Sequence, residues 1–406
     1  MKLEMFHLMP YRDLPADFKE TYRSVWVDVP RHLFDPAKAH QMYNDTLDEL
    51  EYAAAMGYDG ICVNEHHQNA YGMMPSPNIM AAALTRRTKD VAIIVMGNSI
   101  ALYNPPTRVA EEFAMLDVIS GGRLVAGFPV GTPMDSNFCY GENPATFRDK
   151  YYEAEELIIK AWTEMDMFSF DGKYTQLRYV NLWPRPIQQP HPPVWIPGGG
   201  SIEAWDWTVD KGYLYAYLSY SGHRRGKQVM DGFWKAANAK GVDNPYHGGF
   251  LQLVAVADSD AEAEEKYGPH AEYFYNKMLH IYPGFADPPG YRTRDTIKAG
   301  LLAQTGRFDE TPRLTTWKDL LNQGNVIAGT AKSVTEQLEQ VIKDLHIGHL
   351  MILNQFGSIP HDLAMENIKR TAQDVVPNLR PMWSEYEDLW WPKMLPNRQA
   401  AAPALV

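Results

Sequence analysis

Short apolar runs alternate with longer segments of helical periodicity along most of the chain. Apolar runs of this length are typical of strands that are buried on both faces, whereas apolar positions that recur every three or four residues indicate helices with one buried face. The strand pattern occurs at residues 2–9, 60–65, 91–100, 123–130, 193–199, 213–220, 250–257 and 349–357. This order predicts a parallel sheet that is covered by helices.

Eight parallel strands are the number that closes a (β/α)8 barrel. An open doubly wound sheet is the other arrangement, but the first strand is not followed by the Gly-x-Gly-x-x-Gly fingerprint that such sheets use to bind dinucleotides. The pattern therefore favours an α/β fold of the TIM-barrel class. We expect a single domain over residues 1–395 and a disordered tail at 396–406.

Two stretches interrupt the alternation of strands and helices. Residues 163–192 are expected to form short strands and a proline-rich return, and residues 280–328 are long, punctuated by Gly and Pro, and weakly periodic. Long loops in compact enzymes often act as lids. A solvated insertion without such a role is the alternative for both stretches.

Composition narrows the class of ligand. The 406 residues carry a formal net charge of −12, and such a surface repels nucleic acid. The two cysteines, Cys62 and Cys139, give neither a disulfide framework nor a zinc pattern. No signal peptide and no apolar stretch of the roughly 18 residues that span a membrane occurs. We expect a cytoplasmic protein that acts on a small molecule, with no nucleic acid and no membrane as partner.

A carboxylate and two histidines follow the second strand, and the active site of a barrel lies at the carboxyl ends of its strands. If Ile61 and Val63 face the helices, His66 points toward the barrel axis and His67 does not. An imidazole there suits general acid/base catalysis, whereas a histidine that only forms hydrogen bonds within a loop is the alternative. Adjacent histidines on a strand point to opposite faces, so no metal site is expected.

Small polar residues and glycines follow two further strands. Asn98 and Ser99 end the third apolar run, where they are placed to hydrogen-bond a planar ligand. Gly199, Gly200 and Ser201 follow the fifth run and lead into a helix, where free N–H groups bind phosphate and Ser201 is expected to cap the helix. An ordinary turn is the alternative at Asn98 and Ser99. The glycines favour a phosphorylated cofactor, and the absence of a following lysine argues against a Walker loop.

Four blocks in order, at residues 53–67 ("AAAMGYDGICVNEHH"), 75–131, 171–200 and 326–353, resemble the bacterial-luciferase-like family of flavin-dependent monooxygenases. The resemblance covers most of the chain and implies a TIM barrel that binds reduced FMN at its carboxyl end. It implies an NAD(P)H:flavin reductase as the source of reduced FMN, and O2 as the oxidant. The implied reaction inserts one oxygen atom into a small or medium organic substrate through a flavin C4a-hydroperoxide.

The resemblance also assigns residues. His66 falls on the active-site histidine of the family's Glu-His-His motif, which assists proton transfer at the flavin. Asn98 and Ser99 fall where many members have a non-proline cis peptide under the flavin ring. Gly200 and Ser201 fall on the phosphate-binding turn; Tyr151 falls near an aromatic residue that assists the phosphate in some members. A homodimer, commonly through the second and third barrel helices, is implied as well.

The chain departs from the light-emitting members, which have a reactive cysteine and an arginine after the fourth strand. Pro129 and Val130 stand there in this sequence, so luminescence is not expected. Three alternatives to the monooxygenase stay open. They are a deazaflavin (F420)-dependent oxidoreductase on the same barrel, a flavin-binding subunit without catalysis, and a metal-dependent hydrolase that uses His66 and His67.

Overall fold

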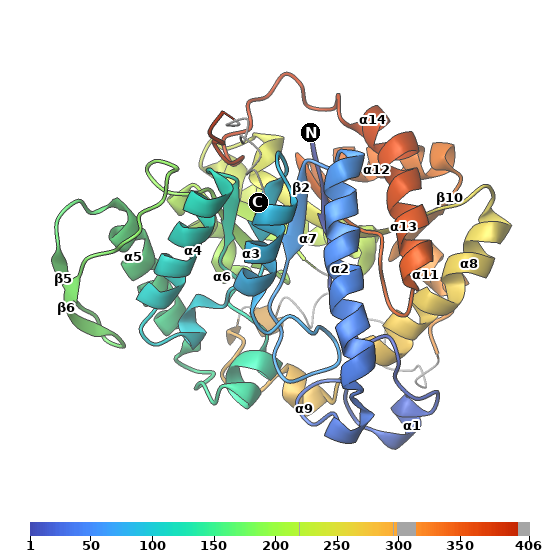
Figure 1. Cartoon of the computed structure of the whole chain (residues 1–406), viewed down its shortest axis with the longest axis horizontal. Helices are drawn as coiled ribbons and strands as arrows, with labels where there is room; N and C mark the ends of the chain where they lie inside the picture. The colour runs from blue at the N-terminus through green and yellow to red at the C-terminus, as the bar shows by residue number, and fades with distance from the viewer. Residues whose placement is uncertain (219, 295, 299–313, 397–406) are drawn as a thin grey trace, which may run out of the picture.

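Eight parallel strands close into a barrel in the computed structural model, which describes residues 1–218, 220–294, 296–298 and 314–396 (Figure 1). In order around the barrel these strands are β1 (Lys2–Phe6), β2 (Gly60–Val63), β3 (Ala92–Val95), β4 (Leu124–Gly127), β7 (Val194–Gly198), β8 (Leu214–Tyr217), β9 (Gly248–Val256) and β11 (His349–Leu353). Pairing of β8 with β9 and of β11 with β1 closes the ring. The predicted TIM barrel is confirmed, and its strands are the eight apolar runs of the sequence.

Helices surround the barrel because each buries one apolar face against the strands. The longer ones are α2 (Pro36–Met56), α3 (Pro77–Arg87), α4 (Thr107–Ser120), α5 (Phe147–Thr163), α6 (Glu203–Lys211), α7 (Gly222–Ala239), α8 (Asp260–Tyr273), α12 (Ala331–Leu345) and α13 (His361–Arg370). The short ones are α1 (Phe18–Thr21), α9 (Pro283–Ala286), α11 (Trp317–Gln323) and α14 (Val376–Leu379). Within the described residues, no helix is long and apolar enough to cross a membrane.

Single turns of other helix types lie in the connections. Three are 3-10 turns, η1 (Arg31–Leu33), η2 (Ile100–Leu102) and η4 (Pro245–His247). Three are π-helical, η3 (Met134–Cys139), η5 (Phe274–Met278) and η6 (Thr371–Val375). The turn η3 follows β4 at the carboxyl end of the barrel, where it contributes to the site described below.

The stretch at 163–192 contains an antiparallel hairpin, β5 (Phe168–Asp171) and β6 (Gln176–Val180), which projects beside α5 (Figure 1). The Glu153 carboxylate of α5 holds the hairpin turn by accepting backbone N–H groups from residues 173–175. Within the stretch at 280–328, β10 (Val326–Gly329) pairs with the carboxyl half of β9 outside the ring, a strand that the apolar pattern did not predict. Residues 295 and 299–313 of this stretch, and the tail from 397, lie outside the described residues.

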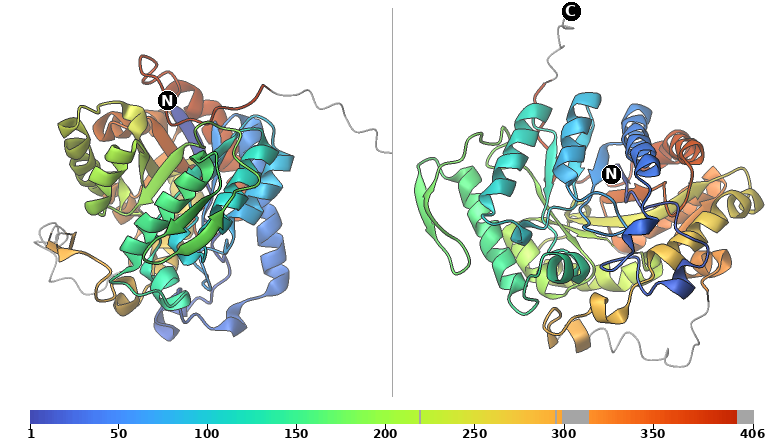
Figure 2. Two further views of the ribbon diagram at one scale, coloured as in Figure 1. Left: turned by 90° about the vertical axis from the view of Figure 1, so that its left-hand side faces the viewer. Right: turned by 60° about the horizontal axis from the view of Figure 1, so that its bottom comes forward.

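The two ends of the barrel are covered differently. The N-terminus and the segment after α14 lie at the top of Figure 1 and of the left view of Figure 2, where the strands begin, and α1 and α9 lie at the opposite end. Trp390 closes the first end, because its carbonyl accepts the Trp195 indole N–H at 3.1 Å and its own indole N–H donates to the Gly212 carbonyl at 2.9 Å. The long β1–α2 loop covers the second end, where the candidate site lies.

Candidate active site

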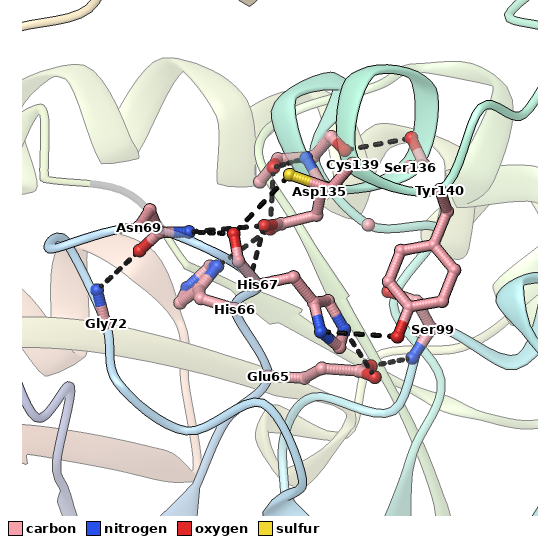
Figure 3. A network of polar contacts seen from close by, with 12 residues as sticks. Glu65, His66, His67, Asn69, Gly72, Ser99, Asp135, Ser136, Cys139 and Tyr140 are labelled. Atoms are coloured by element: carbon pink, nitrogen blue, oxygen red, sulfur yellow. Dashed lines mark hydrogen bonds and ion pairs between the residues drawn. The ribbon is translucent and has the colours of Figure 1, made fainter. Parts of the chain in front are cut away.

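The loops that follow β2, β3 and β4 meet at the carboxyl end of the barrel (Figure 3). Glu65, His66 and His67 come from the first loop, Ser99 from the second, and Asp135 from η3 in the third. Parallel strands deliver the residues after them to one face, so side chains that are far apart in sequence become neighbours. His66 therefore lies at the carboxyl end of a strand, as predicted, but within a cluster of acidic side chains and imidazoles rather than as a lone histidine.

His66 is paired with a buried carboxylate. Its Nδ1 lies 3.0 Å from Asp135 Oδ2, and Asp135 is 3% exposed. The same carboxylate accepts the His67 backbone N–H at 2.8 Å and the Thr132 hydroxyl at 2.9 Å. In the described part of the chain, the other ring nitrogen of His66 makes no hydrogen bond, and the side chain keeps 13% of its surface exposed. Nε2 is therefore the ring atom available to a ligand.

Aromatic rings and a glycine hold the His66 imidazole. Trp26, from the β1–α2 loop, and Tyr71 both meet the ring edge to face, with centroids at 5.0 and 4.8 Å, and they stack on each other at 4.2 Å. On another side the backbone of Gly72 is so close that a Cβ there would lie 2.8 Å from His66 Cδ2. The ring is thus oriented by packing as well as by Asp135.

His67 is buried in a second polar cluster. Its Nε2 lies 3.0 Å from Glu65 Oε1, and its Nδ1 lies 3.4 Å from the Tyr140 hydroxyl. Glu65 also accepts the Tyr103 hydroxyl at 2.7 Å and the Ser99 backbone N–H. Burial, together with the Glu65 charge, raises the pKa of Tyr103, so this phenol stays protonated as a donor. Glu65 links the loops after β2 and β3.

Asn98 presents a buried amide that is only half satisfied. Its Oδ1 accepts a hydrogen bond from Asn78 at 3.0 Å, while its Nδ2 has no partner among the described residues. The expected non-proline cis peptide at Asn98–Ser99 is wrong, because in the described residues cis bonds occur only before prolines. Such a bond costs about 3 kcal/mol, and the Ser99 N–H already reaches Glu65 from a trans peptide.

A glycine turn with a neighbouring arginine follows β7. Gly199 is open, since no atom would lie within 4 Å of a Cβ added there, and Gly200 adopts a left-handed φ of +99°. The Ser201 hydroxyl accepts a hydrogen bond from Arg148 Nη2 at 3.0 Å and donates to Glu203 at 2.8 Å. The prediction that Ser201 caps the helix is wrong, because α6 begins at Glu203 and the hydroxyl is held by that carboxylate instead.

The first turns of α5 carry the arginine. Arg148 Nη1 is buried and has no partner in the described part of the chain. Tyr151, three residues later, is 1% exposed and donates its hydroxyl to the Phe128 carbonyl at 2.7 Å. The structure brings Arg148 to Ser201, and a phosphate contact by Tyr151 stays a prediction. Sequence reasoning missed Arg148, although it lies on the same helix face as Tyr151, three residues away.

Two buried donors without partners, Arg148 Nη1 and Asn98 Nδ2, suit a ligand that carries a phosphate and a planar polar ring. The open turn at Gly199 leaves space for the phosphate. Burial and the nearby Asp135 charge raise the pKa of the Cys139 thiol, in η3, to about 11, which disfavours the reactive thiolate at neutral pH. Among the described residues, no group of three or more His, Cys, Asp or Glu is arranged to hold a metal ion.

Comparisons with known proteins agree with this fold. The family model described as luciferase-like monooxygenase matches residues 24–347. The oxygenase component of a flavin-dependent trigonelline monooxygenase from Acinetobacter baylyi is 29% identical over 370 residues, which are 89% of this chain and 95% of that protein.

Two solved structures share the fold. The FMN complex of the oxygenating constituent of 3,6-diketocamphane monooxygenase from Pseudomonas putida has a TM-score of 0.71 at 18% identity and covers 93% of this chain and 98% of that one. An F420-dependent secondary alcohol dehydrogenase has a TM-score of 0.61 at 19% identity and covers 93% of this chain and 99% of that one.

Proposed function

The chain belongs to the luciferase-like flavin-dependent monooxygenases, and we propose that it uses reduced FMN and O2 to insert one oxygen atom into a small or medium organic molecule. The observation that carries the proposal is the His66–Asp135 pair at the carboxyl end of the barrel, the same end as the open turn at Gly199. The proposal needs a proton-transfer group and a phosphate-binding turn at one end of the barrel, and it assigns these roles to His66 and to the turn at Gly199.

The residues that would hold FMN are the glycine turn and Arg148 on the phosphate, and Asn98 and Ser99 beside the ring. Bound reduced FMN supplies the two electrons that the reaction with O2 consumes. Arg148 adds a fixed positive charge next to Ser201, which offsets the carboxylate of Glu203 at the same turn. The unpartnered Nδ2 of Asn98 offers the ring a donor that is already desolvated.

His66 is the group that gives or takes a proton in this proposal. Nε2 is the atom that acts, since Nδ1 is bound to Asp135. Trp26 and Tyr71, which are 2% and 6% exposed, cover part of the imidazole and limit the access of water to it. Exclusion of water prevents loss of the reactive species by proton leakage before a substrate meets it.

Two protein partners belong to the proposal. The first is an NAD(P)H:flavin reductase, supported by the printed name of the trigonelline enzyme, an oxygenase component. The second is another copy of the chain. The second and third barrel helices, α3 and α4, pack side by side and leave Ile79, Met115 and Ile119 exposed by 71, 49 and 46%. Contiguous apolar patches mark association surfaces, and exposed apolar side chains on two adjacent helices favour such a patch here. A light-scattering mass near 46 kDa would exclude the dimer.

A deazaflavin-dependent hydride transfer is the second candidate, favoured by the likeness of the barrel to the F420-dependent alcohol dehydrogenase. This reaction needs no oxygen. Turnover of an alcohol with F420 under anaerobic conditions, without turnover with reduced FMN and O2, would favour this candidate over the monooxygenase.

The test begins with anaerobic protein and photoreduced FMN, followed by rapid mixing with oxygenated buffer. We expect a lag before the absorbance of oxidised flavin appears, because the protein delays reoxidation. Reoxidation as fast as that of free flavin would contradict the proposal. A substrate screen with isotope-labelled O2 then looks for label in the product, and FMN binding without any turnover across the screen would favour a non-catalytic flavin-binding subunit.

A further inference from the structure

We propose that Asp135 is the positioning residue for His66: it fixes the imidazole in the tautomer that carries a proton on Nδ1 and a lone pair on Nε2. The inference rests on the proposed function, in which His66 transfers protons. The inference adds to that function the residue that decides which ring nitrogen of His66 is available to a ligand and whether that nitrogen carries a proton. The two neutral tautomers of a histidine are selected by the hydrogen bond that one ring nitrogen makes.

The contacts of the Asp135 carboxylate assign the proton. Oδ1 accepts the backbone N–H of His67 at 2.8 Å and lies 3.4 Å from the Asn69 amide nitrogen. Oδ2 accepts the Thr132 hydroxyl at 2.9 Å, and the same hydroxyl oxygen lies 3.4 Å from the Asp135 backbone N–H. Both carboxylate oxygens therefore face donors, as an ionised carboxylate requires. The remaining contact, His66 Nδ1 at 3.0 Å, must also be a donor.

The hydrogen bond to Asp135 selects one of the two orientations of the ring, and packing hinders rotation between them. A half-turn of the imidazole would exchange the positions of Nδ1 and Cδ2 and would break the bond to Asp135. Gly72 lies against Cδ2, while Trp26 and Tyr71 meet the ring edge to face. Orientation and tautomer are thus fixed together, which leaves Nε2 toward the accessible side of the site.

The neighbouring His67 differs from His66 in how it contacts Asp135. Asp135 binds its backbone N–H but not its ring, and the ring contacts Glu65 through Nε2 and Tyr140 through Nδ1. With both nitrogens engaged and 4% of the residue exposed, His67 has no atom to offer a ligand. Asp135 therefore anchors the loop through the backbone of one histidine and orients the ring of the other.

Asp135→Asn is the informative variant. It keeps the size of the side chain and an oxygen for the His67 N–H, but the amide NH2 then faces His66 Nδ1 or the Thr132 hydroxyl. An amide donor to Nδ1 stabilises the opposite tautomer, with the proton on Nε2. We expect kcat to fall by ~10²-fold or more at little change in KM, as when a triad aspartate is replaced and the histidine takes the wrong tautomer.

The decisive readout does not need turnover. Nitrogen-15 spectra of histidine-labelled, flavin-free protein, at a pH where His66 is neutral, distinguish a protonated from a bare ring nitrogen, and His66→Gln identifies the signals. We expect Nδ1–H in the wild type and Nε2–H in Asp135→Asn. Asp117→Asn is the matched control, because Asp117 is equally buried and accepts hydrogen bonds from Ile187 and Gln188. It should leave the His66 signals unchanged.

The outcomes separate this inference from the proposed function. An Nε2–H tautomer in the wild type would overturn the inference even if Asp135→Asn does not fold, and so would an unchanged tautomer in the folded variant. Asp135→Asn added to His66→Ala should lower turnover no further than His66→Ala alone; an additional loss of similar size would count against positioning through His66. If the tautomers are as expected but the wild type neither delays flavin reoxidation nor turns over a substrate, the proposed function fails and the positioning role stands.

Discussion

Replacing Gly72 by alanine tests whether the position of the His66 ring matters, without changing any polar group. The new Cβ would lie 2.8 Å from His66 Cδ2 and 3.2 Å from the Leu8 carbonyl oxygen, and ordinary van der Waals contact begins at 3.4 Å. The ring must retreat by about 0.6 Å, because the Leu8 backbone prevents Cβ from moving away. A misplacement of about 1 Å can cost ~10² in rate, so we expect a loss of roughly tenfold in kcat.

The expected cost in folding stability is small. Overpacking costs about 1–3 kcal/mol, and a Gly→Ala change returns about 0.4–1 kcal/mol by restricting the unfolded chain. Because Gly72 is not in the left-handed region, backbone strain does not contribute.

The assay compares kcat for the substrate found in the screen, FMN affinity and the urea midpoint of unfolding. Gly268→Ala is the matched control: a Cβ there would meet its nearest atom at 3.7 Å, and the residue lies in α8 rather than in the loops after β2, β3 and β4. FMN affinity should be unchanged in both variants. If Gly72→Ala turns over as fast as Gly268→Ala while its His66 signals shift, ring position is not limiting and the reasoning is refuted.

Two further predictions concern the cofactor turn and the closed end of the barrel. Ser201→Asp should weaken FMN binding at least tenfold, because it adds a carboxylate where phosphate is expected; unchanged affinity in a fluorescence titration would mean that the phosphate binds elsewhere. Ser169→Asp, at an exposed position of β5, is the control outside the glycine turn. Burial alone would lower the pKa of His349, but Asp388 and Glu4 raise it to about 9. Stability from protonated His349 is therefore complete below pH 6.5 and lost as pH rises through 9, by about 3 kcal/mol at most. Urea midpoints should fall over this range and flatten in His349→Gln; a flat wild-type profile would contradict the assignment.

The barrel could be predicted from the sequence because its information is local. A strand of a parallel barrel is buried on both faces, so each one appears as a short apolar run between helical segments. β10 was missed because the information that specifies it is not local. Its four residues lie outside the ring, on the overhanging carboxyl half of β9, and that pairing depends on how far β9 extends rather than on the residues of β10.

In the candidate site, too, features set by local sequence could be predicted, whereas contacts between distant segments could not. His66 could be proposed from its position after a strand, but Asp135 is 69 residues away and Arg148 is 53 residues from Ser201. The spacing of these residues in the sequence predicts neither contact, because the conformation of the intervening loops determines where each side chain lies. The failed cap at Ser201 has the same cause: a hydroxyl near a helix start binds the nearest strong acceptor, which here is the Glu203 side chain.

The two buried carboxylates of the site, Glu65 and Asp135, hold different parts of it in place. Glu65 accepts from His67, Tyr103 and the Ser99 backbone, so it fixes the loop after β3 and with it the position of Asn98. Asp135 accepts from His66 and from the backbone of His67. Each acid is compensated by donors, as a buried charge must be. Loss of Glu65 would therefore disturb first the side of the site where we propose that the cofactor binds, whereas loss of Asp135 would disturb first the side proposed for proton transfer.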